Sequence, residues 1–149
     1  MEFREILGGK KEFLSLLLLA DEQEDRVDRY LEKGRMFVLD DDGVKCECVV
    51  KDEGGGVLEI KNLAVEPAFQ RKGYGTAMIE CIAERFRERF DVLQVGTGDS
   101  PATIPFYEKC GFVRWGVRER FFADNYEKPI WDGGVLLVDM IVLRRALRA

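Results

Sequence analysis

Residues 57–90 read VLEIKNLAVEPAFQRKGYGTAMIECIAERFRERF and carry the strongest structural signal in the chain. An apolar strand over 57–65 is followed by a basic turn with two glycines and then by an amphipathic helix over about 75–89. Apolar residues recur along this helix at intervals of three and four, at Ile79, Ile82, Ala83, Phe86 and Phe90. The turn presents unpaired backbone N–H groups and the positive end of the helix dipole at one point. That point favours an anion such as a pyrophosphate.

Spacing separates this turn, Gln70–Thr76, from the two best-known phosphate loops. The dinucleotide fingerprint needs a small residue where this chain has Met78, and an acidic residue about 20 positions later at the end of a second strand. The P-loop needs a Lys and then a Ser or Thr directly after its last glycine, where this chain has Thr76 and Ala77. The turn therefore belongs to neither type, and its pattern is Gln-x-x-Gly-x-Gly.

Three segments together point to one family. They are Glu59–Val65 (EIKNLAV), the Gln-x-x-Gly-x-Gly turn, and Phe106–Phe112 (FYEKCGF) far downstream. In this combination the chain resembles the GCN5-related N-acetyltransferases, the acetyl-CoA-dependent GNAT family, over almost its whole length. The resemblance implies an α/β (α+β) fold with a mixed, mainly antiparallel central sheet flanked by helices. It also implies a parallel central pair of strands that splay apart, so that the pantetheine of acetyl-CoA enters the gap.

The resemblance assigns cofactor contacts to individual residues. The pyrophosphate contacts would come from Gln70, Gly73 and Gly75 and from the backbone N–H groups of Arg71, Lys72, Tyr74 and Thr76. The segment Leu63–Ala64–Val65 would lie along the pantetheine, and Leu63 and Val65 would bind it through their main chains. Taken without the other motifs, the same turn could equally be a plain connection between a strand and a helix. No metal is expected.

Tyr107 is the general acid that the resemblance implies, and it would protonate the departing CoA thiolate. A thiol has a pKa of about 8.5 and a phenol of about 10, so this proton transfer is nearly balanced. The alternative is that Tyr107 only packs in the core. The general base is less well defined. Glu59 on the central strand is the first candidate, Glu66 at the end of that strand is the second, and a solvated surface carboxylate is the alternative for Glu59.

The composition limits the chemistry. The chain has no histidine, which removes the Ser-His-Asp and Cys-His routes to an acyl-enzyme, so acyl transfer should be direct. Its net charge of −5 disfavours nucleic acid and suits a cationic amine. The four cysteines, Cys46, Cys48, Cys81 and Cys110, lack the spacing of a zinc site or a disulfide framework, and we interpret them as packing residues.

Length and apolar content predict one domain over residues 1–149, with a full hydrophobic core. The longest apolar run, Leu16–Ala20, is too short to span a membrane, and Met1–Glu5 does not resemble a signal peptide. We therefore predict a cytoplasmic protein without a membrane partner.

The remaining segments read as short elements. In the first half we expect an edge strand over 1–7, helices over 11–20 and from Asp21 to about Gly34, a hairpin of strands 36–39 and 44–50 around an acidic turn, and a mobile loop over 51–56. In the second half we expect a strand over 92–95, a loop over 96–101, a short helix over 103–109, and a closing pair of strands over 112–118 and 135–143. An aromatic loop, Phe121–Trp131, would connect that pair.

Two functions stay open at this stage. The first is an N-acetyltransferase that moves acetyl from acetyl-CoA to a primary amine of a small molecule or peptide by direct attack. The second is a non-catalytic acyl-CoA-binding or sensor module, which would have no need of the Tyr107 proton donor. The sequence does not identify the acceptor amine. The aromatic loop with the last strand is the apolar patch expected to be exposed, and it predicts a homodimer.

Overall fold

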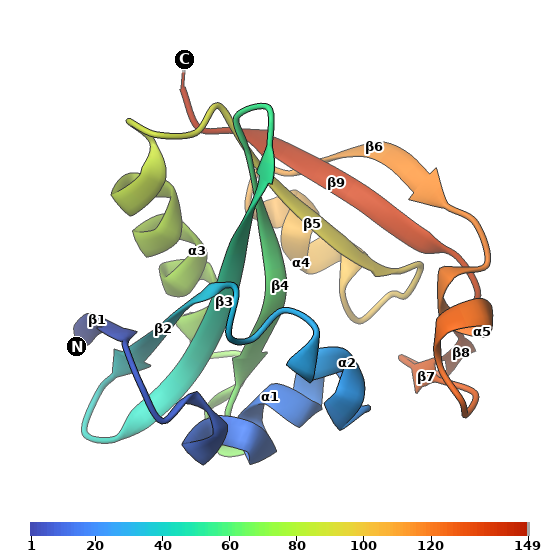
Figure 1. Ribbon diagram of the computed structural model, residues 1–149, viewed down its shortest axis with the longest axis horizontal. Helices are drawn as coiled ribbons and strands as arrows, with labels where there is room; N and C mark the ends of the chain where they lie inside the picture. Colours follow the sequence, from blue (N-terminus) through green and yellow to red (C-terminus); the bar gives the residue numbers. More distant parts are fainter. Residues whose placement is uncertain (149) are drawn as a thin grey trace.

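The computed structural model describes residues 1–148, which are organised around a seven-stranded sheet (Figure 1). The strand order is β1-β2-β3-β4-β5-β9-β6. Within the described residues β4 and β5 are the one parallel pair, and all other neighbours in this sheet are antiparallel. The predicted mixed sheet with a parallel central pair is therefore confirmed.

The first half of the chain forms β1 (Glu2–Ile6), the 3-10 helix η1 (Lys10–Phe13), α1 (Leu14–Ala20), α2 (Glu24–Asp28), β2 (Arg35–Asp40), β3 (Val44–Gly54) and β4 (Val57–Val65). The second half forms η2 (Pro67–Phe69), α3 (Tyr74–Phe86), β5 (Val92–Gly98), α4 (Ile104–Lys109), β6 (Val113–Arg118), α5 (Phe121–Asn125), β7 (Trp131–Asp132), β8 (Val135–Leu136) and β9 (Met140–Ala146). Strands β7 and β8 pair with each other in a separate small sheet.

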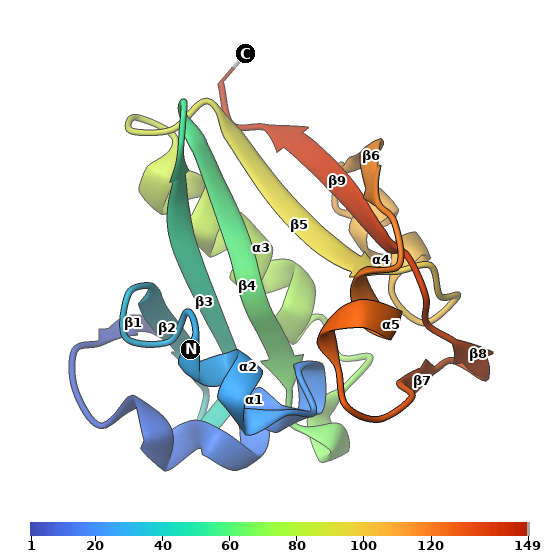
Figure 2. The same cartoon turned by 45° about the vertical axis from the view of Figure 1, so that its right-hand side comes forward.

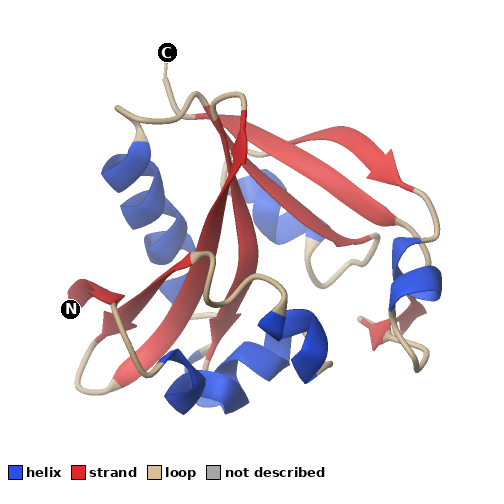
Figure 3. Cartoon of the chain, viewed as in Figure 1, coloured by secondary structure: helices blue, strands red, loops and turns tan. Residues whose placement is uncertain are grey.

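Helices cover both faces of the large sheet (Figure 3). On one face α3 and α4 enclose the larger core cluster, where Met78, Ile79, Ile82 and Phe86 are fully buried. The predicted apolar stripe of α3 is thus confirmed. On the other face α1 and α2 cover a smaller cluster that includes Leu17, Val27, Val38 and Val49. The sheet is buried on both sides at its centre, which explains the four consecutive buried apolar residues of β2, Met36–Leu39.

A bulge in β4 separates the central strands. Val49 of β3 pairs with Asn62, but the next residue, Val50, pairs with Ile60, so Lys61 is an extra residue in β4. The pairing of β4 with β5 ends at the same point, at Ile60 and Val95, although both strands continue. A bulge bends its strand and ends regular pairing. Beyond it β4 and β5 diverge, as Figure 2 shows.

Several predicted boundaries are wrong. Residues 51–56 are no mobile loop: β3 continues to Gly54, which pairs with Val57 across a two-residue turn. Gly55 and Gly56 have φ of 63° and 80°, the left-handed conformation that such hairpin turns require. The helix predicted from Asp21 to Gly34 is limited to Glu24–Asp28.

The predicted strand over 135–143 is divided in two. Val135 and Leu136 turn back on Trp131 and Asp132 through Gly133 and Gly134, which have positive φ. The strand that belongs to the large sheet, β9, starts at Met140 and runs to Ala146 along the full length of β5. The pairing also keeps Gly96–Gly98, predicted as loop, within β5.

Candidate active site

A cavity of about 370 Å³ lies where β4 and β5 diverge. The strand residues on its wall include Leu63 of β4 and Gly96 and Gly98 of β5. Tyr107 of α4 lies on the same wall, and residues of α1, α2, β6 and the α5–β9 segment complete it. The cavity therefore joins the splayed strands to several connections that are far apart in the sequence.

The unpaired half of β4 exposes its backbone toward the gap. The N–H of Glu66 donates to the carbonyl oxygen of Lys45 on β3, at 2.9 Å. Because backbone groups alternate in direction along a strand, Ala64 also faces β3, whereas Leu63 and Val65 face the gap. The geometry places the predicted main-chain contacts of Leu63 and Val65 where an extended ligand could reach them, and it turns those of Ala64 away.

The turn before α3 has the geometry of an anion site. Gly73 is the N-cap residue of α3, with φ of 91° and no side-chain cap. A Cβ at this position would meet no atom within 4 Å, so the backbone is open to a ligand. The first bond of the helix joins the Ala77 N–H to the Gly73 carbonyl oxygen, which leaves the preceding N–H groups of the helix without intrahelical acceptors. Gly75 lies inward, where a Cβ would come within 3.0 Å of the Phe106 ring.

Side chains of the turn tie it to neighbouring elements. Gln70 Nε2 donates to the Val65 carbonyl oxygen at 3.1 Å, so this side chain connects the turn to the end of β4. The Tyr74 hydroxyl donates to Asp41 Oδ2 at 2.7 Å, in the turn between β2 and β3. Arg71, Lys72 and Thr76 are exposed, and the ammonium of Lys72 lies 5.4 Å from the centre of the Phe69 ring. Two cationic side chains thus flank the open backbone.

Tyr107 lies on the cavity wall with its ring held between two phenylalanines. The ring centroids of Phe106 and Phe112 are 5.0 Å and 5.5 Å away, both in edge-to-face contact. Burial raises the pKa of the phenol above its ordinary value, which keeps the hydroxyl protonated at neutral pH. It also makes proton transfer to a thiolate less balanced than the ordinary pKa values predict. Among residues 1–148 the hydroxyl has no hydrogen-bond partner, so it is free to donate to a ligand.

Glu59 is buried, and both of its carboxylate oxygens have partners. The alternative, a solvated surface carboxylate, is therefore wrong. Its Oε1 accepts from Gln94 Nε2 at 2.8 Å and from Arg118 Nη2 at 3.1 Å, and its Oε2 contacts the Lys61 ammonium. Burial raises the pKa of Glu59, but Lys61, Gln94 and Arg118 outweigh it and hold the pKa below its ordinary value. Glu59 is therefore a fixed anion and a weak base.

The second base candidate, Glu66, lies elsewhere. It follows the end of β4, beside the phosphate turn, and it does not line the cavity. None of the four cysteines lines the cavity either, and burial raises the pKa of each thiol. Among the described residues, no group of three or more His, Cys, Asp or Glu side chains is arranged to hold a metal ion.

Sequence reasoning missed the far wall of the cavity. Asp21, at the end of α1, accepts a hydrogen bond from the Tyr30 hydroxyl at 3.0 Å and from the Tyr126 hydroxyl at 2.7 Å. These residues come from segments up to 105 positions apart, and no local motif marks them. Arg118, which holds Glu59 from β6, was missed for the same reason.

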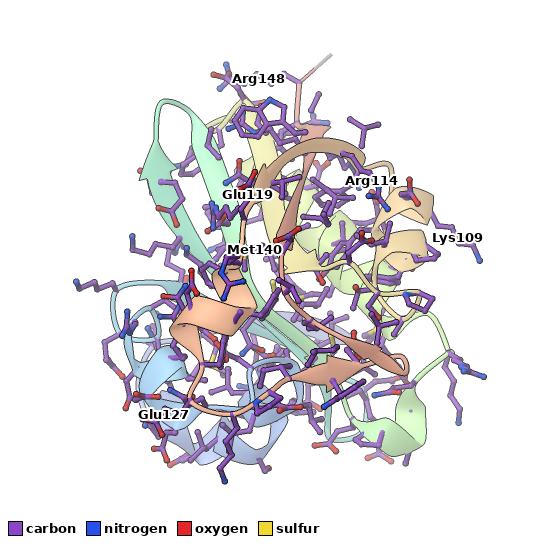
Figure 4. All side chains as sticks on the ribbon, turned by 90° about the vertical axis from the view of Figure 1, so that its right-hand side faces the viewer. Lys109, Arg114, Glu119, Glu127, Met140 and Arg148 are labelled. Carbon is purple, nitrogen blue, oxygen red and sulfur yellow. The ribbon has the colours of Figure 1, made fainter. Side chains whose placement is uncertain are left out.

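The aromatic segment 121–131 is predicted from the sequence to be an exposed apolar patch, but most of its aromatic side chains face the cavity. Phe121, Phe122 and Tyr126 turn inward and line the cavity, whereas Trp131 is 63% exposed. Figures 2 and 4 show α5 and the chain near Glu127 beside α1 and α2, and the Glu127 N–H donates to Gln23 Oε1. Exposed apolar residues are found instead on the edge strand β6, at Val113, Trp115 and Val117, although a bulge at Trp115 places Val113 and Val117 on opposite faces of the strand.

Comparison with known proteins identifies the family. The family model for the acetyltransferase (GNAT) domain matches residues 32–114, more than half of the chain. An uncharacterised N-acetyltransferase from Bacillus subtilis, YvbK, is 33% identical over 89% of this chain and 87% of its own length. The chain belongs to the GNAT family of acetyltransferases, and the predicted family and enzyme class, an acetyl-CoA-dependent N-acetyltransferase, are confirmed.

Solved structures agree with this assignment over nearly the whole chain. A GNAT family acetyltransferase from Elizabethkingia anophelis, solved with acetyl-CoA bound, superposes with a TM-score of 0.91 at 30% identity, covering 97% of both chains. An acetyltransferase from Bacillus cereus, described as an IAA acetyltransferase, superposes with a TM-score of 0.89 at 31% identity, covering 97% of this chain and 98% of its own. No helix among residues 1–148 is long and apolar enough to cross a membrane.

Proposed function

We propose that this chain acts as one N-acetyltransferase domain that moves the acetyl group of acetyl-CoA to a primary amine, with both substrates bound at once. The observation that carries the proposal is that three features lie side by side along the gap between β4 and β5. These features are the open helix N-terminus at Gly73, the backbone of Leu63 and Val65 that lacks a strand partner on the side of the gap, and Tyr107. The related E. anophelis acetyltransferase, solved with acetyl-CoA, has the same fold.

In this proposal the turn holds the pyrophosphate and β4 holds the pantetheine. Backbone N–H groups over Arg71–Thr76, with the charges of Arg71 and Lys72, would bind the phosphate oxygens. Gln70 would keep the turn in place through Val65 rather than touch the ligand itself. Leu63 and Val65 would pair with the amides of the pantetheine as one strand pairs with another.

The acetyl transfer then takes place in one step beside Tyr107. The amine nitrogen attacks the thioester carbonyl carbon, a C–N bond forms, and the C–S bond breaks. Tyr107 donates its hydroxyl proton to the departing sulfur and recovers a proton from water. Direct attack is supported by the absence of histidine and by the four cysteines, none of which lines the cavity.

The proton of the attacking amine passes to solvent water. The lowered pKa of Glu59 makes this carboxylate inefficient as a direct base. Its charge is balanced by Lys61 and Arg118, so its role is to fix these two cations on the cavity wall.

Two measurements test the function. Saturating acetyl-CoA should raise the melting temperature, and a panel of primary amines should release free CoA at rates that depend on the amine. An unchanged melting temperature would contradict the whole proposal. Stabilisation without CoA release from any amine would instead favour an acyl-CoA sensor.

We also propose a cytoplasmic homodimer. The support for a dimer is the group of exposed apolar residues on the edge strand β6, at Val113, Trp115 and Val117, which are 65%, 61% and 56% exposed. The bulge at Trp115 distributes them over both faces of the strand. Light scattering should give twice the chain mass, and Trp115→Lys should give a monomer. A monomer mass for the unchanged protein would contradict this arrangement. The support for the location is the set of four free thiols, which is typical of a reducing compartment.

A further inference from the structure

The cavity wall opposite Tyr107 contains a carboxylate that is prepared for a cation. Asp21 accepts hydrogen bonds from the hydroxyls of Tyr30 and Tyr126, one on each oxygen. Burial raises the pKa of Asp21 above its ordinary value, and the two hydroxyl donors oppose that rise because they favour the ionised form. They also fix the orientation of the carboxyl group on the wall of the cavity that it lines. Among residues 1–148 no Lys or Arg nitrogen lies within 4.0 Å of this carboxylate.

Two of the three cationic side chains that line the cavity are paired with carboxylates, and the third, Arg26, acts on Asp21 only through its charge, without an ion-pair contact. Lys61 and Arg118 both contact Glu59, and Lys61 also contacts Glu53 at 2.6 Å. Arg26 is turned toward aromatic rings, with its guanidinium carbon 5.3 Å from the centre of Phe121 and 5.4 Å from that of Tyr126. The lining carboxylates Glu22 and Asp132 have no ion-pair partner in the described part of the chain. The unpaired charge on this wall is therefore mainly negative.

A second observation concerns Asn62, which belongs to the same hydrogen-bond network through Tyr30. This side chain lines the cavity and is only 3% exposed, yet its Oδ1 has no hydrogen-bond partner within residues 1–148. Its Nδ2 donates to the Tyr30 hydroxyl at 3.0 Å and to the Leu17 carbonyl oxygen at 2.9 Å, which fixes the amide. A buried acceptor without a donor is costly, so it favours a ligand with N–H groups.

Aromatic rings complete this end of the cavity. Phe122 and Tyr126 are stacked with their centroids 5.8 Å apart, and the Phe121 ring packs edge-to-face on Phe122 at 5.4 Å. The faces of such rings attract organic cations and pack against methylene groups. A carboxylate, a buried carbonyl acceptor and ring faces together match an alkylammonium group rather than an anion or a neutral alcohol.

The acetylated amine cannot occupy this position during the reaction, because it must be uncharged and close to Tyr107. We infer that the acceptor carries a second, positively charged amino group, which Asp21 binds while the first amine is acetylated. The substrate class is therefore a diamine or a molecule with an equivalent amino-terminated side chain. This inference rests on the proposed acetyl transfer, and it assigns Asp21 as a specificity-determining residue.

Three acceptors that share one reacting amine test the inference. Diaminopentane, aminopentanol and aminopentanoic acid, each with its functional groups at the two ends, differ only in the charge of the far end. For the unchanged protein, kcat/KM should be about tenfold or more higher for the diamine than for the alcohol, and lowest for the acid. Asp21→Asn should reduce the ratio of diamine to alcohol to nearly one, mainly through KM, and Tyr126→Phe should reduce it by a smaller factor.

The controls separate this inference from the function on which it rests. Asp25→Asn changes the net charge equally on an exposed position of α2 outside the cavity, and it should keep the original ratio. Acetyl-CoA should stabilise every variant to the same extent, which shows that each is folded. Equal rates for the diamine and the alcohol, turnover of other amines but not of the diamine, or an Asp21→Asn variant with the original ratio would overturn the inference. Loss of the acetyl-CoA effect in the unchanged protein, or no turnover of any amine, would instead overturn the function.

Discussion

The turn proposed to hold the phosphates and the cavity wall proposed to hold the acceptor are built in opposite ways. We call the second region, formed around Asp21, Tyr30 and Tyr126, the acceptor wall. The turn occupies seven consecutive residues, Gln70–Thr76, and its binding groups belong mostly to the backbone. The acceptor wall is made of side chains from α1, α2 and the segment after α5, and the hydrogen bond from Tyr126 to Asp21 joins residues 105 positions apart. A turn of the first kind is common to a family, because any sequence with the right glycines forms it. A wall of the second kind can change with each connection, and so can the substrate.

The largest effect should come from closing the turn. Gly73→Glu places a side chain and a negative charge where the backbone is now open, and it strains a residue with φ of 91°. We expect acetyl-CoA affinity to fall by about 10³-fold or more, because both the space and the charge oppose the phosphates. Calorimetric titration measures the affinity, and circular dichroism checks the fold. Affinity within a few fold of the original would show that the phosphates bind elsewhere.

A smaller effect is expected for a substitution that changes the catalytic step and leaves both binding regions intact. Tyr107→Phe removes one hydroxyl that has no partner in the described structure, so packing against Phe106 and Phe112 should persist. We expect kcat to fall by roughly 10²-fold, while the dissociation constant of acetyl-CoA stays unchanged. Steady-state kinetics and titration give the two numbers. Full turnover at saturating substrates would reduce Tyr107 to a packing residue.

A third substitution concerns β3, the strand that pairs with β4. Glu47 of β3 pairs with Ala64 of β4 and is completely buried. No side chain within residues 1–148 hydrogen-bonds to its carboxyl oxygens, and the Ala64 backbone opposes the effect of burial on its pKa without cancelling it. Burial raises the pKa of Glu47 well above its ordinary value. The folded protein therefore holds the proton that the unfolded chain releases above about pH 4.3, and stability falls as the pH rises from there toward the folded pKa.

Glu47→Gln removes this titration and should stabilise the protein at neutral pH. The difference in unfolding free energy between the two proteins should grow by about 1.4 kcal/mol for each pH unit above the unfolded pKa, until the folded pKa is reached. Urea unfolding of both proteins from acid to neutral pH measures it. A difference that does not depend on pH would mean that Glu47 keeps its ordinary pKa.

The smallest effect should come from one contact of the acceptor wall. Arg26 of α2 lies over the rings of Phe121 and Tyr126 and joins two parts of the wall. Arg26→Gln should lower the free energy of unfolding by about 0.5–1 kcal/mol, the size of a partly exposed cation–π contact, and leave acetyl-CoA affinity unchanged. Thermal unfolding and titration provide the test. A change in acetyl-CoA affinity would show that the two regions are coupled.

The difference between the regions also explains what the sequence could predict. The turn, the apolar stripe of α3 and the hairpin around Asp40–Gly43 depend on neighbours in the chain, and their predictions match the structure. The bulge at Lys61 has no such signal, because it exists only in the register with β3. The burial of Glu59 depends on Arg118 from β6, and the role of Asp21 depends on Tyr126. The fold and the acetyl donor, acetyl-CoA, were therefore predictable from the sequence, but the acceptor wall was not.

The divergence of β4 and β5 leaves a sheet edge in the middle of the molecule. Natural edges are usually protected by charges, bulges or covering segments, and this one has the extra residue Lys61 and helices above and below it. Under the proposed function, acetyl-CoA takes the place of the missing neighbour, so the folded protein is completed by a metabolite. Its resistance to proteolysis in the cell should then follow the local supply of acetyl-CoA: a concentration 100 times the dissociation constant adds about 2.7 kcal/mol to the stability. The abundance of this enzyme would thereby depend on the same molecule that it consumes.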